Sequence, residues 1–143
     1  MLIGEYKHSL DGKGRLSIPV KFRSELGSSA IVTKGLEGCL FVYPKESWDI
    51  MAQKLSNLPV SSSNARAFSR LMLSGAMEVE IDKLGRALIP GYLREYADLE
   101  GEVVVNGVYN RLEIWDKKAW TTYSKDAEGK SSEIAESLTE WEV

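Results

Sequence analysis

Two segments of the sequence place an aspartate four residues before an arginine, and the arginine of each is a candidate to bind an anion. Residues 11–19 read Asp-Gly-Lys-Gly-Arg-Leu-Ser-Ile-Pro, and residues 82–90 read Asp-Lys-Leu-Gly-Arg-Ala-Leu-Ile-Pro. Glycine tolerates positive φ and aspartate accepts hydrogen bonds from nearby backbone, so each segment predicts a tight turn followed by a strand. A guanidinium on a rigid turn can bind a phosphate or a base edge through two parallel hydrogen bonds. Arg15 and Arg86 are therefore the first candidates for contact with nucleic acid.

The aspartates and glycines of these segments have a structural interpretation. Asp11 and Asp82 can pair with the arginines or cap the turns, and Gly14 and Gly85 supply the backbone freedom that the turns need. This interpretation makes the four residues turn-fixing. A place for the aspartates beside the ligand stays open.

Other basic residues surround the two turns. Lys13 adds a charge to the first turn, and Lys83 would have to serve in the second, where Leu84 holds the position that matches Lys13. The short helices expected after the prolines carry further candidates for DNA contact: Lys21, Arg23 and Arg94. Each also fits an ordinary solvated helix face, as do Arg66 and Arg70 farther along the chain. Arg23 and Arg94 hold the same position in the two segments, which favours a shared role.

The two segments belong to a longer internal repeat. Aspartate, glycine, arginine, isoleucine and proline recur at an offset of 71 residues, and after a one-residue slip Gly35 matches Gly107 and Trp48 matches Trp120. Matching flanks in one frame indicate a duplicated unit. We expect four regions: unit 1 at 5–47, a helical linker at 48–75, unit 2 at 76–119 and an acidic helical tail at 120–143.

Each unit reads as short strands around turns with one short helix, so the fold class expected is α+β and mostly β. Strands are expected in these ranges: 4–10, 15–18, 31–33, 40–43, 78–81, 86–89, 102–105 and 112–115. Prolines and Asp116 begin helices, and in the linker a helix from Ala65 to Ser74 is expected, with Asn64 as its cap. Neither unit alone would bury much apolar surface. The sequence therefore predicts that the two units interlock in one barrel-like core.

The charge is unevenly distributed. The chain carries −3 overall, but residues 126–143 hold six acids and one base, or −5, which leaves +2 for the rest. Residues 1–23 hold five bases and two acids, a local +3. Such a patch can attract an anion although the protein is acidic. Because one subunit offers only two arginine turns, useful affinity for DNA would need several linked subunits.

The sequence offers little for catalysis or for a cofactor. His8 has no marked nucleophile or orienting acid and is expected to be a strand residue. No motif for a metal, a nucleotide or a hydrolase is present, so we expect no enzyme, no metal and no cofactor. The single Cys39 lies in an apolar run, which predicts a buried thiol and suits a reducing cytoplasm. No apolar run is long enough to span a membrane.

Around the two turns the chain resembles the MraZ family of bacterial transcriptional regulators. The resemblance rests on residues 4–11 (Gly-Glu-Tyr-Lys-His-Ser-Leu-Asp), on residues 14–19, on the turn at 35–40 and on residues 81–86, and it extends over essentially the whole length. It implies two SpoVT-AbrB-like units in a swapped-hairpin, double-psi-like β-barrel with peripheral helices. It also implies ring-shaped homo-oligomers that bind short G-rich direct repeats upstream of the division and cell-wall gene cluster. The DNA-contacting arginines of the family fall on Arg15 and Arg86.

From the residues and this resemblance we expect a cytoplasmic, nucleoid-associated regulator, acting as a repressor on double-stranded DNA. The alternative is an AbrB-like interaction module of the antitoxin type, in which the acidic tail binds a basic partner. The tail argues against a disordered toxin-binding segment because Ile134, Leu138 and Trp141 form an apolar stripe at helical spacing.

Overall fold

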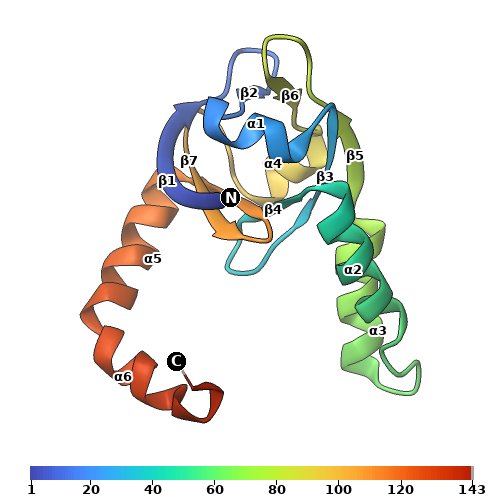
Figure 1. Cartoon of the computed structure of the whole chain (residues 1–143), viewed down its shortest axis with the longest axis vertical. Helices are drawn as coiled ribbons and strands as arrows, with labels where there is room; N and C mark the ends of the chain where they lie inside the picture. The colour runs from blue at the N-terminus through green and yellow to red at the C-terminus, as the bar shows by residue number, and fades with distance from the viewer. Residues whose placement is uncertain (143) are drawn as a thin grey trace.

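The computed structural model describes residues 1–142, in which eight strands form two antiparallel sheets (Figure 1). The strands are β1 (Leu2–Ser9), β2 (Arg15–Ser17), β3 (Ser29–Lys34), β4 (Leu40–Tyr43), β5 (Met77–Glu80), β6 (Arg86–Leu88), β7 (Glu102–Tyr109) and β8 (Leu112–Asp116). The helices are α1 (Val20–Leu26), α2 (Lys45–Ser56), α3 (Ser63–Ser69), α4 (Gly91–Tyr96), α5 (Lys117–Gly129) and α6 (Ser131–Ser137). The expected α+β class is confirmed, but the chain is not mostly β, because in residues 1–142 the helices hold more residues than the strands.

The larger sheet has six strands in the order β1-β7-β8-β4-β3-β5, and β2 pairs with β6 in a separate two-stranded sheet. Single bridges join the small sheet to the two edges of the large one, Leu10 with Leu16 and Ile81 with Ala87. Within residues 1–142 the ladders themselves do not close into a barrel.

Most of the strand pairs connect the two halves of the chain. Among the described residues, β1 pairs with β7, β2 with β6, β3 with β5 and β4 with β8, whereas β3–β4 and β7–β8 pair within a half. The main core accordingly mixes residues from matching positions of the repeat. Its buried pairs are Leu16 with Ala87, Ile18 with Ile89, Phe22 with Leu93, and Leu26 with Ala97. The expectation that the two units interlock is confirmed, but a single barrel-like core is not shown, since the described residues form two buried clusters.

A second apolar cluster lies where α2, the residues after α3, and α5 pack on the large sheet. Trp48 packs on Tyr43 with ring centroids 5.5 Å apart, and Trp120 packs on Trp115 at 5.1 Å, so the matched tryptophans have matched partners. Cys39 is buried here, as expected, and burial raises its pKa to about 12.

The linker helix differs from its prediction. It begins at Ser63, and Ser62 is its cap, because the Ser62 hydroxyl accepts a hydrogen bond from the Ala65 N–H at 3.2 Å; Asn64 lies inside the helix. The α-helix ends at Ser69 and continues as a π-helix over Arg70–Ser74. There the buried Thr33 hydroxyl donates to the Met72 carbonyl at 2.7 Å, and a side chain that binds a helix carbonyl accounts for such a widened turn.

The helices divide between two ends of the molecule (Figure 1). α1 and α4 lie beside the β2–β6 sheet, whereas α2–α3 and α5–α6 extend from the opposite end as two separate arms. The tail is helical as expected, with α6 followed by a 3-10 turn over Thr139–Trp141.

Candidate nucleic-acid interface

The two Asp–Arg segments fold into the same hydrogen-bonded turn. In the first, one carboxylate oxygen of Asp11 accepts from the backbone N–H groups of Lys13 and Arg15, both at 2.9 Å. The other oxygen accepts from Arg15 Nε at 2.7 Å. Each turn therefore fixes its arginine through the backbone and through the guanidinium at once.

The second turn repeats this network. Asp82 accepts from the N–H groups of Leu84 and Arg86 at 2.9 Å, and from Arg86 Nε at 2.9 Å. In both turns the contact uses Nε, so the terminal Nη nitrogens are the part of the guanidinium that can meet a ligand. The arginine side chains are about one-third exposed, at 30% and 31%.

These bonds also shift the pKa of both carboxylates. The backbone N–H of Arg15, followed by the Arg15 side chain and the N–H of Lys13, lowers the pKa of Asp11 to about 2. The pKa of Asp82 is lowered by the equivalent N–H of Arg86 and by its side chain. Hydrogen bonds to the charged form stabilise it. Both aspartates are therefore ionised at neutral pH and keep the arginines in place.

Pairing of β2 with β6 brings the two turns together on one face. Leu16 lies opposite Ala87, and both are buried, so the residues on either side of them point to the outer face. That outer face carries Arg15, Ser17, Arg86 and Leu88. The turns lie next to each other at one end of the molecule in Figure 1.

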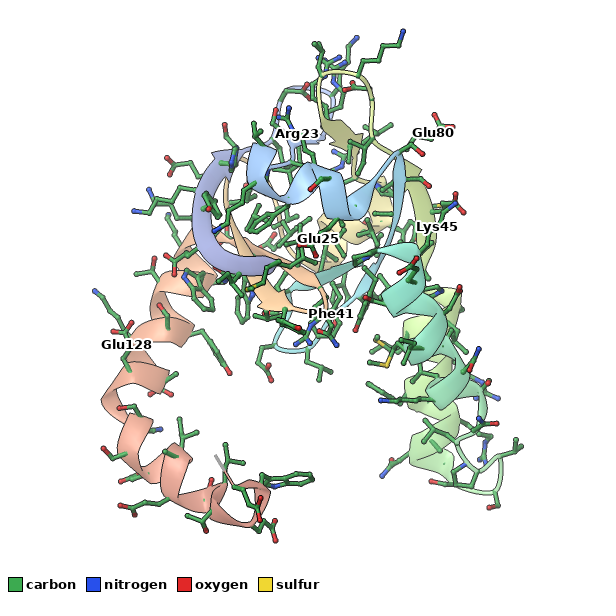
Figure 2. The ribbon with its side chains drawn as sticks, viewed as in Figure 1. Arg23, Glu25, Phe41, Lys45, Glu80 and Glu128 are labelled. Atoms are coloured by element: carbon green, nitrogen blue, oxygen red, sulfur yellow. The ribbon has the colours of Figure 1, made fainter. Side chains whose placement is uncertain are left out.

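Arg23 and Arg94 are bonded within the protein, whereas the sequence also allowed them to lie on solvated helix faces. Arg23 Nε donates to the Ile18 carbonyl at 2.8 Å, and Arg94 Nε donates to the Ile89 carbonyl at 2.9 Å. Figure 2 shows Arg23 beneath the two turns. Its guanidinium occupies the space beside Gly85, where an added Cβ would overlap it.

The contact is reciprocal. A Cβ at Gly14 would lie 2.6 Å from Cζ of Arg94, so each arginine packs against the turn of the other half. Both glycines are buried and have positive φ, +84° for Gly14 and +79° for Gly85. Backbone bonds tie the same elements together, since the Ile18 N–H donates to the Gly85 carbonyl at 2.8 Å and the Ile89 N–H to the Gly14 carbonyl at 3.0 Å.

Lys13, Lys83 and Lys21 are exposed on and beside the turns. The surroundings of the two turns differ in charge. Residues 1–23 carry +3, whereas the matching window 72–94 has three bases and three acids and carries zero. His8 lies on β1 opposite Val103, which confirms it as a strand residue.

The second turn borders an open groove lined by Met77, Val79, Leu88 and both turn arginines. Glu78, also on the groove, pairs with Lys45 at 2.9 Å, and this contact lowers its pKa. Within residues 1–142 no three His, Cys, Asp or Glu side chains gather as they would around a metal. In the same part of the chain, every helix is too short or too polar to cross a bilayer.

Two arginine turns on one outer face can contact an anionic ligand such as a phosphate. Comparison with known proteins gives the family. A family model described as "MraZ protein, putative antitoxin-like" matches residues 1–71 and again residues 72–141, so the chain belongs to the MraZ family. The two matches fall on the two halves of the repeat; the finer division at 5–47, 48–75, 76–119 and 120–143 stays a prediction.

Curated relatives match the chain over 96–100% of its length. The chain is 47% identical over 143 residues to "Transcriptional regulator MraZ" of Natranaerobius thermophilus, covering 100% of both chains. It is 52% identical over 138 residues to the protein of the same name from Halothermothrix orenii, covering 96% of both. It is 49% identical over 143 residues to that of Caldanaerobacter subterraneus subsp. tengcongensis, covering 100% of both. The relatives are named as regulators, which confirms the expectation that the chain is not an enzyme.

Proposed function

We propose that this protein is a sequence-specific DNA-binding transcriptional regulator that acts as a repressor. Its targets would be short G-rich direct repeats upstream of the division and cell-wall gene cluster, including its own gene. The observation that carries the proposal is the pair of identical Asp–Arg turns on the outer face of β2–β6. The name shared by the relatives supports it.

The residues have distinct roles in this proposal. Arg15 and Arg86 direct their Nη nitrogens to guanine O6 and N7, the commonest specific contact in the major groove. Lys13, Lys83 and Lys21 bind phosphates, which supply affinity without sequence information. Asp11, Asp82, Gly14 and Gly85 fix the turns. Arg23 and Arg94 act chiefly by holding the opposite turn, because their guanidinium groups pack against Gly85 and Gly14.

For the fold, we propose the AbrB-like swapped-hairpin barrel with the four regions given above. The bridges Leu10–Leu16 and Ile81–Ala87 support it, because they connect the small sheet to both edges of the large one. The pairing of the halves through four ladders supports the swapped arrangement.

We also propose that the protein acts as a ring-shaped homo-oligomer on the nucleoid, in the cytoplasm. One chain of net charge −3 has few phosphate contacts, and linked subunits on neighbouring repeats raise the effective concentration of each turn. Assembly would therefore allow an acidic protein to bind DNA tightly.

Fluorescence anisotropy with DNA from upstream of the protein's own gene tests the proposal. Arg15→Ala and Arg86→Ala should each weaken binding by about 1–3 kcal/mol per lost bidentate contact, with circular dichroism unchanged. Lys118→Ala, at an exposed residue of α5, serves as the control and should bind as wild type. Normal binding by both arginine variants would show that the turns are structural.

An antitoxin-type interaction module is the second candidate, favoured by the words "antitoxin-like" in the family description. A toxin partner would be bound through the acidic tail and would not require Arg15 or Arg86. Loss of DNA binding in the turn variants would favour the regulator, whereas turn variants that bind DNA normally, with a basic partner protein lost only when the tail charges are removed, would favour the interaction module.

A further inference from the structure

The C-terminal end of the chain forms a helix whose apolar face has no cover in the structure. Every residue from 131 to 142 is exposed, including Ile134 at 44%, Leu138 at 39% and Trp141 at 70%. α6 has only seven residues, and isolated helices shorter than about 12–15 residues are marginal in water. An amphipathic segment of this length needs a surface on which to pack.

The other arm offers an apolar groove. Where α2 meets α3, the groove is lined by Leu55, Leu58, Val60 and Leu73, with Arg66 and Arg70 beside them. Val60 is 78% exposed and Leu73 36%. Arg66 is held in place because its Nη1 donates to the Val60 carbonyl at 2.8 Å.

The two surfaces carry opposite charge. Residues 131–142 contain four acids, Glu133, Glu136, Glu140 and Glu142, and no base, which gives −4. Residues 45–75 contain four bases and two acids, which gives +2. An acidic helix with an apolar stripe therefore complements a basic rim around an apolar groove.

A chain cannot easily fill its own groove. α5 is anchored to β7 and β8, where Trp120 and Tyr123 pack on Trp115 with centroids 5.1 and 5.0 Å away. In Figure 1 the α5–α6 arm and the α2–α3 arm stand apart on opposite sides of the body. The occupant of the groove is then a segment of a second copy.

We propose that α6 and the turn after it, residues 131–142 of one subunit, dock in the α2–α3 groove of the next subunit. The inference rests on the homo-oligomer proposed above and identifies its contact surfaces. Tail and groove are different surfaces, so the contact is head-to-tail, the type that generates rings when the rotation closes. Both arms lie at the end opposite the arginine turns, so docking leaves the turns free.

The test uses two full-length variants and their mixture. A tail variant carries Leu138→Asp and Trp141→Ala, and a groove variant carries Val60→Asp and Arg70→Glu. These side chains are all exposed, so the body should melt as in wild type by circular dichroism. Val20→Asp, at a residue that is 76% exposed on α1, is the matched control.

Light scattering coupled to size exclusion should find a large assembly for wild type and for the control, and a single chain of 16.0 kDa for each variant alone. An equimolar mixture should form a species of two chains, because the intact tail of the groove variant fits the intact groove of the tail variant. Variants that keep the wild-type mass, or a mixture that stays at one chain, would overturn the proposal.

A DNA-binding measurement separates this inference from the proposed function. The tail variant keeps both arginine turns. If docking is correct, it should bind DNA with one repeat as a single chain, and its affinity should not rise on DNA with several repeats. If wild type assembles as described but binds no upstream DNA, the regulator proposal fails and the docking proposal stands.

Discussion

The guanidinium of Arg23 fills the space in which a β-carbon of residue 85 would lie, and Gly85 immediately precedes Arg86. Arg94 stands in the same relation to Gly14, which precedes Arg15. The short helix of each half thus supports the arginine turn of the other half. Neither turn is an autonomous hairpin, and four residues at two positions of the repeat form one structural unit.

Alanine at Gly85 or at Gly14 should destabilise the protein by roughly 1–3 kcal/mol, because both have positive φ and the β-carbon would displace an arginine side chain from its carbonyl partner. Gly12→Ala is the control, since nothing lies within 4 Å of a β-carbon there. Urea unfolding measures the difference. Equal stability of all three variants would contradict the close packing of Arg23 and Arg94 on the turns.

Arg23→Ala should lower DNA affinity without changing its salt dependence. A residue that positions a turn releases no counterion, whereas loss of one phosphate contact makes the slope of log K against log salt shallower by about 0.9. Lys13→Ala provides the comparison and should make the slope shallower. Titrations at several salt concentrations measure this slope for each variant. If Arg23→Ala makes the slope as shallow as Lys13→Ala does, Arg23 contacts the phosphate backbone.

The stability of the first turn should depend on pH in acid. The pKa of Asp11 is lowered in the folded state from 3.8 to about 2, so its contribution is complete above about pH 4 and disappears as the pH falls through about 2. The free energy of unfolding of wild type should therefore fall more steeply between pH 4 and pH 2 than that of Asp11→Asn. A constant difference between the two proteins across this range would mean that the Asp11 hydrogen bonds do not stabilise the ionised form.

Cys39 should resist alkylation in the folded protein. Its side chain is buried, and burial raises its pKa to about 12, so almost no thiolate is present at pH 8. Mass spectrometry after treatment with iodoacetamide should show modification only in denaturant. Labelling of the native protein at the denatured rate would show that the second apolar cluster opens readily.

The turns were predictable because their chemistry is local. Asp11 and Arg15 are four residues apart, and the same spacing at Asp82 and Arg86 allowed the repeat to be recognised from residue types alone. Matching positions of the repeat are also buried alike, as at Phe22 and Leu93.

The partners of Arg23 and Arg94 could not be predicted in this way. Each arginine packs on a glycine of the opposite half, and this contact depends on the register of β2 with β6, which no local pattern encodes. The sequence did contain a signal, because both arginines and both glycines recur at one offset. The cap at Ser62 was missed because Ser and Asn are equally good caps, and only the path of the chain selects between them.

The pairing of β1 with β7 bears on how the protein is made. Leu2 lies opposite Tyr109 and Ser9 opposite Glu102, so during synthesis β1 waits for roughly 100 further residues before its partner β7 emerges. At about 5–20 residues per second this delay lasts on the order of 5–20 seconds, during which an edge strand is open to wrong partners. A nascent chain that stops before β7 would carry the first arginine turn on an incomplete sheet. Prematurely terminated products should therefore be cleared or aggregate, and would not compete with the finished protein.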